Sequence, residues 1–313
     1  MVSLEELATI GHLTIDKIKL GAGLSHEAPG GPSFYASLIA SRLGVSTRVL
    51  SKVGVDYPLS NLKILEDSGV DTSLIKRAPL PTTRFQLEYD NNAGRSLRVL
   101  SICEEIGLED CLGLEEDLAV HIGPVVDEVS HDVYRSLSQR IDFLSIDVQG
   151  IVRLIDEGGW VSLKTPSNVS FLKGISLVKA TGEELLYLLG MENITAAVKS
   201  FFKRVGRESL LTVTLGKQGC LLLTSNEKFK APAYPVREIG DPTGAGDVLI
   251  GGIISSILNG EDLDYALAVG VASASFCIEK TSVYNFSVGS DLEERIQWVY
   301  SRIRRGPLYP VFQ

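Results

Sequence analysis

The sequence has few cysteines and no pattern of metal ligands. Its 313 residues include four cysteines, at positions 103, 111, 220 and 277, with no CxxC pair and no histidine at metal-ligand spacing from them. Such spacing predicts neither a disulfide framework nor a structural zinc site. A reducing, cytoplasmic location fits this composition best.

Positive charge is also scarce. Thirty lysines and arginines stand against 39 aspartates and glutamates, which gives a formal net charge of −9. Nucleic acids and anionic membranes favour a basic protein surface, so neither is expected as the main partner.

No targeting or membrane-spanning segment is expected from the sequence. The first residues, MVSLEELATI, contain glutamates but no lysine or arginine, unlike a signal peptide. The richest apolar stretch, 248–278, is divided at 259–262 by Asn-Gly-Glu-Asp into two segments too short to cross a bilayer. We expect both segments to be buried helices of a soluble protein.

What the sequence does contain is a regular alternation of short apolar runs and longer helical patterns. This alternation is typical of an α/β fold with a mainly parallel sheet, here predicted as a single domain over 1–313. The strands are predicted at Leu7–Gly11, Thr47–Val53, Leu118–Ile122, Phe143–Val148, Ile175–Val178, Leu210–Leu215 and Cys220–Leu223, with a further strand-like run at Ala233–Ile239. The helices are predicted at Pro32–Arg42, Leu59–Ser68, His131–Gln139, Glu183–Leu189, Ala196–Arg207, Gly244–Leu258, Leu263–Ile278 and Asp291–Arg304.

Two segments depart from this alternation. In 82–101, apolar and polar side chains alternate on both sides of Asn91-Asn92-Ala93-Gly94, which predicts a β-hairpin. A similar alternation opens the segment 14–24. We expect the two segments to pair into a small lid over the functional site.

The stretch Asp241–Gly252, DPTGAGDVLIGG, carries the most chemical information. Glycines at the start of a helix let free N–H groups approach an anion such as a transferring phosphate. Asp247, within one turn of these groups, is placed to accept a proton from a substrate hydroxyl. The same residues also fit an ordinary helix start, in which Asp241 caps the helix, Pro242 takes the first helical position and Asp247 complements the dipole.

Several other phosphate-binding and catalytic motifs are absent. Gly216-Lys217 lacks the remaining residues of GxxxxGK[ST], and neither GAG triplet continues into GxGxxG. GxSxG, HExxH and HRD sequences are also missing, which removes the usual basis for hydrolase, zincin or protein-kinase function.

In several sequence segments the chain resembles the ribokinase-like (PfkB) carbohydrate kinases. DPTGAGD looks like the family's C-terminal signature, and Pro29–Gly54 contains its N-terminal glycine pair. TLGKQGC at 214–220 resembles the family's nucleotide-binding turn, while IDVQGIVR at 146–153 and FLKGISLVKATGEELLYLLG at 171–190 are similar to inositol-kinase-like members. The resemblance implies a three-layer α/β/α fold with a mainly parallel central sheet and a small β lid.

The resemblance also assigns roles to individual residues. It implies that Asp247 is the catalytic base, and that the backbone of Gly244, Ala245 and Gly246 forms the anion hole. Asp16 would bind two hydroxyls of the substrate, with Gly30 and Gly31 bringing the backbone close to it. From the residues alone, Asp16 also fits a solvated charge beside two lysines, and the glycines fit a simple turn.

Further site residues follow the remaining matched segments. Gln149 and Arg153 come after a strand, at the edge where open α/β sheets bind ligands, and are predicted to contact the substrate; a surface arginine on the next helix is the alternative for Arg153. By resemblance, the nucleotide would lie against Thr214, Gly216, Gly219, Asp241 and Thr243, with the 272–282 region near the adenosine.

The chain departs from the family at its magnesium-organising segment. The usual Asn-x-x-Glu reads Thr181-Gly182-Glu183-Glu184, so Glu184 is predicted to act on Mg²⁺ through water, without the asparagine. Some relatives also bind K⁺ beside the segment corresponding to Asp241–Thr243.

Together, the resemblance implies an ATP- and Mg²⁺-dependent phosphotransferase that acts on an alcohol group of a sugar or cyclitol, with an inositol-like polyol favoured. A nucleoside (adenosine-type) kinase and a non-catalytic nucleotide- or polyol-binding regulator remain as alternatives. The expected partners are the small polyol and ATP, in a monomer or in a homodimer formed through the lid.

Overall fold

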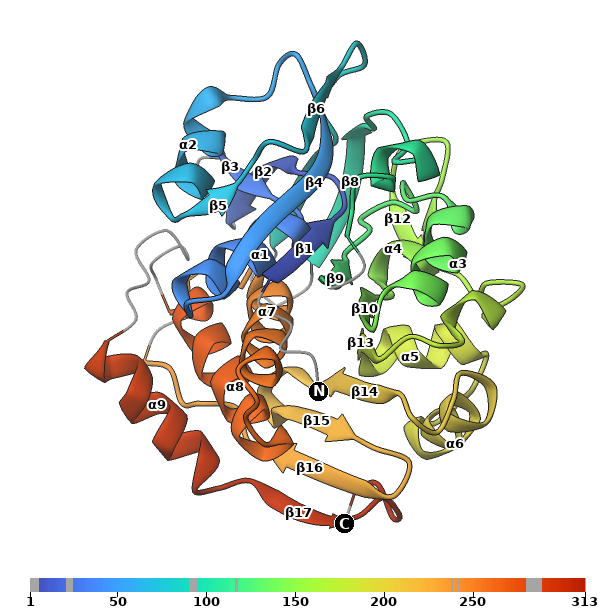
Figure 1. Ribbon diagram of the computed structural model, residues 1–313, viewed down its shortest axis with the longest axis vertical. Helices are drawn as coiled ribbons and strands as arrows, with labels where there is room; N and C mark the ends of the chain where they lie inside the picture. The colour runs from blue at the N-terminus through green and yellow to red at the C-terminus, as the bar shows by residue number, and fades with distance from the viewer. Residues whose placement is uncertain are drawn as a thin grey trace.

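A computed structural model describes residues 6–20, 25–89, 95–115, 118–237, 239–240, 242–279 and 289–312. Within them the chain forms one large sheet, a smaller four-stranded sheet and helices on both faces of the large sheet (Figure 1). None of the helices in these ranges combines the length and the apolar character needed to cross a bilayer.

The large sheet is parallel over most of its width. Its strands, in spatial order, are β17 (Arg304–Pro307), β16 (Glu227–Ala231), β15 (Cys220–Leu223), β14 (Leu210–Thr214), β13 (Leu177–Thr181), β10 (Phe143–Asp147), β9 (Ala119–Ile122), β1 (Glu6–Ile10), β4 (Ser46–Gly54) and β5 (Val70–Asp71), with β6 (Ile75–Ala78) also paired to β4. The pairs from β14 to β5 are parallel, whereas β15, β16 and β17 add antiparallel strands at one edge.

Helices cover the two faces of this sheet and give it two separate cores. On one face lie α1 (Pro32–Arg42), α2 (Leu59–Asp67), α7 (Ala245–Leu258), α8 (Leu263–Ile278) and α9 (Ser290–Tyr300); on the other lie α3 (His131–Arg140), α4 (Gln149–Val152), α5 (Gly182–Leu189) and α6 (Ile194–Arg204). Strand β1 shows the alternation, because Leu7 packs in the first core while Ala8 and Ile10 pack in the second. Strands covered on both faces are almost wholly apolar, so short apolar runs in the sequence were enough to predict them.

Two predictions near the C-terminus are wrong. The helix predicted at Asp291–Arg304 ends at Tyr300, because Arg304–Pro307 pairs with β16 as β17. The run predicted as a strand at Ala233–Ile239 is irregular over 233–237, and the strand lies earlier, at Glu227–Ala231. Pro232 and Pro235 explain the shift, since proline has no N–H for a sheet ladder.

The smaller sheet has the order β3 (Ser25–Gly30), β2 (Thr14–Leu20), β7 (Arg84–Tyr89) and β8 (Arg95–Ser101). Strands β7 and β8 pair antiparallel, and β2 pairs parallel with β7. The turn expected at 91–94 and the last four residues of the segment 14–24 lie outside the described residues. A short hairpin of β11 (Arg153–Ile155) and β12 (Val161–Leu163) adjoins β8, where the Val99 N–H donates to the Gly159 carbonyl at 2.8 Å.

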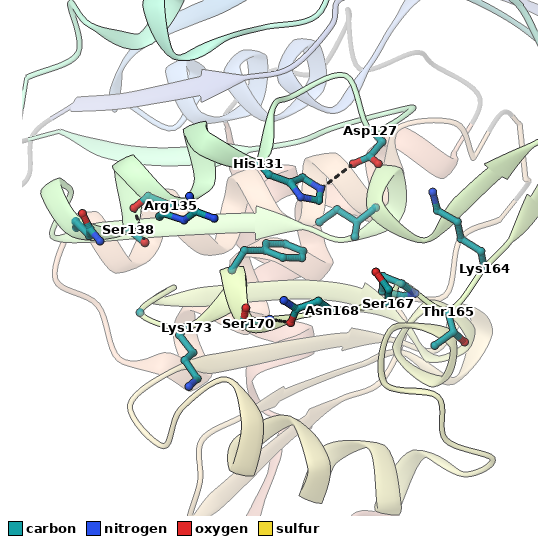
Figure 2. Close-up of a pocket in the computed structure, with 15 residues that line it drawn as sticks. Asp127, His131, Arg135, Ser138, Lys164, Thr165, Ser167, Asn168, Ser170 and Lys173 are labelled. Atoms are coloured by element: carbon teal, nitrogen blue, oxygen red, sulfur yellow. Dashed lines mark hydrogen bonds and ion pairs between the residues drawn. The ribbon is translucent and has the colours of Figure 1, made fainter.

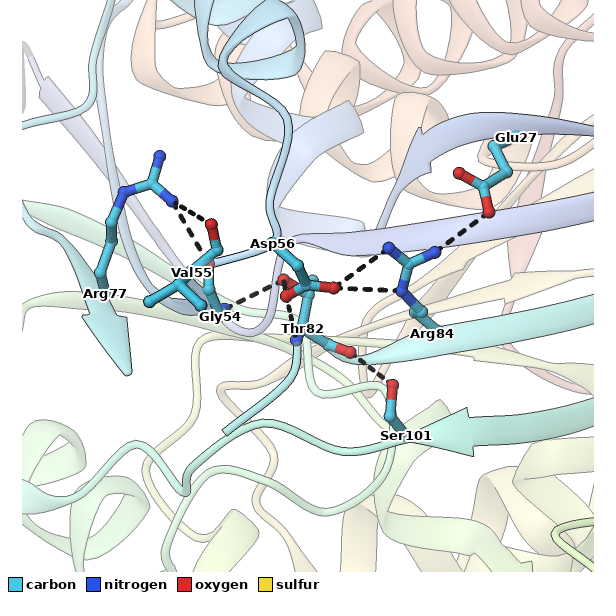
Figure 3. A network of polar contacts seen from close by, with 8 residues as sticks. All are labelled: Glu27, Gly54, Val55, Asp56, Arg77, Thr82, Arg84 and Ser101. Carbon is cyan, nitrogen blue, oxygen red and sulfur yellow. Dashed lines mark hydrogen bonds and ion pairs between the residues drawn. The ribbon is translucent and has the colours of Figure 1, made fainter. Parts of the chain in front are cut away.

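An ionic network ties the small sheet to the rest of the fold (Figure 3). Arg84 of β7 donates to Asp56, in the loop after β4, at 3.0 and 3.3 Å, and to Glu27 of β3 at 3.0 Å. Both the N–H and the hydroxyl of Thr82 donate to the other Asp56 oxygen at 2.8 Å. These hydrogen bonds hold the pKa of Asp56 below its usual value, although partial burial opposes them.

Candidate active site

Two adjoining cavities lie at the carboxyl edge of the large sheet, beneath the small sheet. One has a volume of about 910 Å³ and the other about 70 Å³. Both are lined by Leu97, Gln149, Arg153, Gly244 and Asp247. Asp247 therefore stands at the boundary between a large cleft and a small chamber.

The backbone at the start of α7 forms the floor of this boundary. Gly244 is in the left-handed conformation, with φ 81°, and a Cβ there would lie 2.6 Å from the Tyr35 ring, so only glycine fits. The Ala245 N–H donates to the Pro242 carbonyl at 3.1 Å, whereas the Gly246 N–H meets no acceptor within the described residues. Of the predicted anion hole, the Ala245 amide is thus already hydrogen-bonded, whereas the Gly246 amide is available to a ligand.

The alternative reading of this segment as an ordinary helix start is wrong in one respect. Helix α7 begins at Ala245 with Gly244 as its N-cap, so Pro242 does not occupy the first helical position. Asp241 lies outside the described residues.

Asp247 has an unusual electrostatic environment in the first turn of α7. Burial raises the pKa of its carboxyl group to about 7; Lys179 and Arg153 oppose this rise, while Asp147 and Glu184 add to it. A carboxylate with a pKa near neutrality is suited to take up a proton during a reaction and release it afterwards.

Lys179, on β13, is a site residue that the sequence analysis missed. Its Nζ donates to Asp147 Oδ2 at 2.6 Å, and both side chains are buried. Burial by itself lowers the pKa of Lys179, but Asp147, Glu184 and Asp247 raise it above its usual value, so the ammonium stays charged. A Cβ on Gly246 would lie 3.1 Å from this Nζ, which places the charge directly beneath the start of α7.

The predicted residues Gln149 and Arg153 lie together, on and just after the one-turn helix α4. Arg153 donates to Gln149 Oε1 at 2.9 Å and to the Val125 carbonyl at 2.8 Å. The Gln149 N–H donates to Asp147, so α4 is joined to the Lys179 pair. Arg153 is held at the boundary of the two cavities and does not extend freely into solvent as the alternative reading supposed.

Asp16, on β2, is buried rather than solvated, while its neighbours Lys17 and Lys19 are exposed. Its Oδ1 accepts a hydrogen bond from the Thr14 hydroxyl at 2.7 Å, and it lines the small chamber. A Cβ on Gly30, in β3, would lie 2.2 Å from Asp16 Oδ2, so the absence of a side chain there makes room for the carboxylate.

Gly31 also lines the small chamber, just before α1. Its φ is 95°, and a Cβ there would lie 2.3 Å from the His12 carbonyl oxygen. Both the conformation and the close approach of backbone require glycine at this position.

The predicted nucleotide residues divide between the two cavities. Thr214, at the end of β14, and Gly216 and Gly219, in the β14–β15 connection, line the large cleft, and Thr243 lines the small chamber. The cleft also has apolar walls, formed by Ala233, Tyr234, Leu249, Val271, Ala274 and Ile278. Tyr234 could not be found from its sequence, because it lies in the segment mistaken for a strand.

Thr181 and Glu184 cap helix α5 reciprocally. The Thr181 N–H donates to Glu184 Oε2 at 2.7 Å, and the Glu184 N–H donates to the Thr181 hydroxyl at 3.1 Å. Both residues line the large cleft. In the part of the chain that the structure describes, no three His, Cys, Asp or Glu side chains gather as a metal site.

Known proteins resemble this chain over most of its length. Residues 14–288 match the family described as pfkB family carbohydrate kinase. The chain is 24% identical to an inositol 3-kinase of Arabidopsis thaliana over 280 residues, 86% of this chain and 73% of that protein. It is 24% identical to a cytidine kinase of Thermococcus kodakarensis over 295 residues, 90% of this chain and 99% of that protein.

A solved structure shares the fold. A pyrophosphate-dependent kinase of the ribokinase family, complexed with a pyrophosphate analog and myo-inositol, matches with a TM-score of 0.79 at 22% identity, over 92% of this chain and 99% of that chain. The predicted α/β fold of the ribokinase type is therefore confirmed. Because the family match spans most of the sequence, this protein belongs to the pfkB family of carbohydrate kinases, phosphotransferases that act on hydroxyl groups.

Proposed function

We propose that this enzyme transfers the terminal phosphoryl group of ATP to a hydroxyl of a small polyol, with an inositol-like cyclitol as the favoured acceptor. The position of Asp247 carries the proposal, since this carboxyl group borders both the cleft and the small chamber. A base that takes the acceptor's proton must contact the acceptor next to the phosphoryl donor.

The acceptor would occupy the small chamber. Asp16 offers carboxylate oxygens to neighbouring hydroxyls, and Gln149 and Arg153, which also line the chamber, offer donors. Gly30 and Gly31 allow the backbone to approach the acceptor closely. This combination of acceptors and donors is suited to a compact molecule that carries several hydroxyl groups.

The transferring phosphoryl group would lie between the chamber and the cleft. The Gly246 N–H and the Lys179 ammonium are placed to stabilise its negative charge. As the acceptor oxygen forms its bond to phosphorus, the bond to the departing ADP breaks and the acceptor's proton passes to Asp247. The pKa of about 7 suits this uptake at neutral pH.

The apolar walls of the cleft support ATP as the donor. Tyr234, Val271, Ala274 and Ile278 offer a surface that a nucleobase can cover and that inorganic pyrophosphate cannot. Pyrophosphate is the second candidate donor, because the solved relative named above is pyrophosphate-dependent.

The donor set fits Mg²⁺ held mainly by donor phosphates and water. Glu184 lines the cleft with one oxygen engaged in the α5 cap, and Asp147 is engaged by Lys179, so the chain provides few free ligands of its own. Bound Mg²⁺ would neutralise phosphate charge during transfer. Thr243, with Asp241, marks the place proposed for K⁺.

The small sheet would act as a lid, formed by about 14–24 and 82–101 on a single kinase domain of residues 1–313. Phe85, Leu87 and Leu97 of this sheet line the small chamber. A closed lid would exclude water from the phosphoryl group and so limit hydrolysis of the donor.

The relatives are all kinases, but they differ in the acceptor that their names give, so they indicate the acceptor less clearly than the reaction. The similarity to an inositol 3-kinase favours a cyclitol, while the similarity to a cytidine kinase keeps a nucleoside as the second candidate. The small volume of the chamber, about 70 Å³, and the Asp16 and Arg153 side chains in its lining favour the smaller, more hydroxylated molecule.

A matrix of donors and acceptors tests the proposal. ATP and pyrophosphate are each combined with inositols, nucleosides, ribose and fructose, with and without K⁺, and the phosphorylated product is measured directly. We expect ATP with an inositol to give the highest kcat/KM, and Asp247→Asn to lower kcat at least about 10³-fold while ATP still binds. A protein that binds ATP and polyol but phosphorylates no acceptor would be a regulator rather than a kinase.

A further inference from the structure

A third cavity, of about 720 Å³, lies beside α3 and shares no lining residue with the two catalytic cavities (Figure 2). Its cations are dispersed, because Arg135 and Lys164 lie at opposite ends and Arg135 pairs with Asp132 at 3.2 Å. The rings of His131 and Phe171 stack on each other there, with centroids 5.4 Å apart. A more ordered arrangement of a cation and aromatic rings lies against the large cleft.

That cation is Arg295 of α9, which lies next to the apolar walls of the large cleft but is not among the described residues that line it. Its guanidinium carbon is 3.7 Å from the centroid of the Phe276 ring and 4.7 Å from that of the Tyr234 ring. Of these two rings, Tyr234 lines the cleft. A cation over an aromatic face attracts the ring, so Arg295 holds Tyr234 from outside the cleft.

Hydrogen bonds to the end of α8 fix the same guanidinium. One of its nitrogens donates to the Ser275 hydroxyl at 2.8 Å, and another donates to Glu279. Ser275 itself lines the cleft and donates in turn to the Ala272 carbonyl at 2.6 Å. Only 14% of the Arg295 side chain is exposed, so the cation is mostly buried and its planar fork has a defined position.

The segment that carries Tyr234 depends on this arginine for a second reason. Residues 232–237 belong to no helix or strand, so no regular ladder of hydrogen bonds holds them. The Arg237 N–H donates to Glu279 Oε1 at 3.2 Å, and the other oxygen of Glu279 accepts from Arg295. Arg295 therefore holds the segment both at the Tyr234 ring and through Glu279.

A second side chain of α9 contacts the Tyr234 ring. The Trp298 ring meets it edge to face, with centroids 5.2 Å apart and planes at 74°. Trp298 and Arg295 are three positions apart and so lie on the same face of α9. The position of the Tyr234 ring thus depends on α9, although none of the residues described for this helix lines the cleft.

We propose that Arg295 is a positioning residue for the nucleotide donor, which holds Tyr234 in place to contact the nucleobase without itself contacting the nucleotide. The inference rests on ATP as the proposed donor and assigns part of its recognition to a side chain outside the cleft. A wall that is held in place before binding loses less freedom when the base arrives, which favours affinity. Pyrophosphate carries no base, so its use should not depend on Arg295.

Calorimetric titration with ADP tests this role without turnover. Arg295→Ala and Tyr234→Ala should each weaken ADP binding at least about fivefold, because each removes an ordered aromatic contact with the base. Arg295→Ala/Tyr234→Ala should bind ADP about as weakly as Tyr234→Ala alone, since Arg295 acts through the Tyr234 ring. Additive losses in the double variant would overturn the proposal.

Arg305→Ala is the matched control. Arg305 also lies over a ring, with its guanidinium carbon 5.3 Å from the Phe229 centroid, and also pairs with a carboxylate, that of Glu227. Neither partner is among the residues that line the cleft, so this variant should bind ADP as the wild type does. Equal weakening by Arg305→Ala and Arg295→Ala would indicate a general loss of packing and would also overturn the proposal.

Arg295→Lys covers the case in which Arg295→Ala does not fold. Lysine keeps a positive charge for Glu279 but has no planar group to lie over both rings, so ADP binding should weaken at least about threefold. Thermal unfolding shows whether each variant is folded. In that case, an Arg295→Lys protein with the ADP affinity of the wild type would contradict the assigned role.

Steady-state kinetics separate positioning of the donor from catalysis. In Arg295→Ala the KM of ATP should rise at least about fivefold, while kcat and the KM of the acceptor change less than about twofold, because the lost contact is the same in the ground and transition states. Any rate with pyrophosphate should be equal in the variant and the wild type. A lower kcat with an unchanged KM of ATP would overturn the proposal.

The same measurements distinguish failure of this inference from failure of the proposed donor. A wild-type protein that binds no ADP and uses pyrophosphate alone would refute ATP as the donor and the role of Arg295 with it. A wild-type protein that binds ADP as tightly as Arg295→Ala does would refute the role of Arg295 and leave ATP as the donor.

Discussion

Asp247 carries a carboxyl group whose pKa of about 7 depends on the charges around it. Burial raises the pKa, and Lys179 is the largest opposing influence. Because the group must be ionised to accept a proton, kcat/KM for the acceptor should fall as the pH drops below about 7.

The double variant Asp147→Asn/Lys179→Met removes the buried ion pair without leaving one charge unpaired. Lys179 lowers the pKa of Asp247 more than Asp147 raises it, so losing both should move the acid limb of the pH–rate profile upward by roughly half to one pH unit. Lys203→Ala, a surface change on α6, serves as the control and should leave the limb in place. A limb that moves downward would contradict the assigned role of Lys179.

The raised pKa of Asp247 also predicts a stability effect. A carboxyl group whose pKa is about 7 when folded and near 3.8 when unfolded destabilises the fold increasingly as the pH rises between these values. Asp247→Asn should therefore increase the free energy of unfolding at pH 8 by roughly 1–3 kcal/mol, and by almost nothing at pH 3.5. Urea denaturation at both pH values measures the difference; equal effects at both would show that the native carboxyl is not perturbed.

At the scale of secondary-structure elements, β3 shows how a weak strand builds a site. Its sequence, SHEAPG, has little β propensity, but pairing with β2 sets Gly30 opposite Thr14 and against the Asp16 carboxylate. Strand β3 thus provides space for a functional side chain rather than a side chain of its own.

Gly30→Ala is a direct test of this arrangement. The added methyl group would lie 2.2 Å from Asp16 Oδ2, so the carboxylate must move. We expect the KM of the acceptor to rise at least tenfold while the KM of ATP changes less than twofold. The matched control is Gly113→Ala, where an added Cβ meets no atom within 4 Å; parallel rises in both KM values for Gly30→Ala would indicate general disruption.

These elements also show what the sequence could and could not predict. Apolar strands and the start of α7 depend on local residue patterns, so most of the parallel sheet and the position of Asp247 in the first turn of α7 were predictable. The position of Lys179 in the site could not be predicted, because it depends on the ion pair with Asp147, 32 positions earlier on a neighbouring strand. One signal was present, a single lysine within the apolar run of β13. Strand β17 forms through long-range pairing with β16, and β3 forms through pairing with the adjacent β2. Both consist of residues with weak strand preferences, so periodicity does not reveal them.

At the scale of the whole molecule, the small sheet supplies Phe85, Leu87 and Leu97 to the wall of the small chamber. We propose that the position of this sheet relative to the large one decides whether the chamber is closed. The network of Arg84, Asp56, Glu27 and Thr82 spans this connection (Figure 3). Its groups are partly exposed, so the network contributes little to overall stability. Its effect should instead be on closure of the small sheet.

Arg84→Ala removes the bonds from β7 to Asp56 and Glu27 without touching either catalytic cavity. If the small sheet closes over the acceptor as a lid, the variant should raise the KM of the acceptor roughly three- to tenfold and increase the fraction of ATP hydrolysed without phosphorylating it, because water reaches the phosphoryl group more easily. Parallel assays of ADP release and phosphorylated acceptor measure that fraction.

The control is Arg305→Ala, which removes an exposed ion pair with Glu227 between β17 and β16 and should leave both quantities unchanged. In the contrary case, Arg84→Ala leaves the fraction of ATP hydrolysed without phosphorylation unchanged and reduces stability only as much as Arg305→Ala does. That result would mean that the network is an ordinary surface contact and that closure depends on other parts of the small sheet.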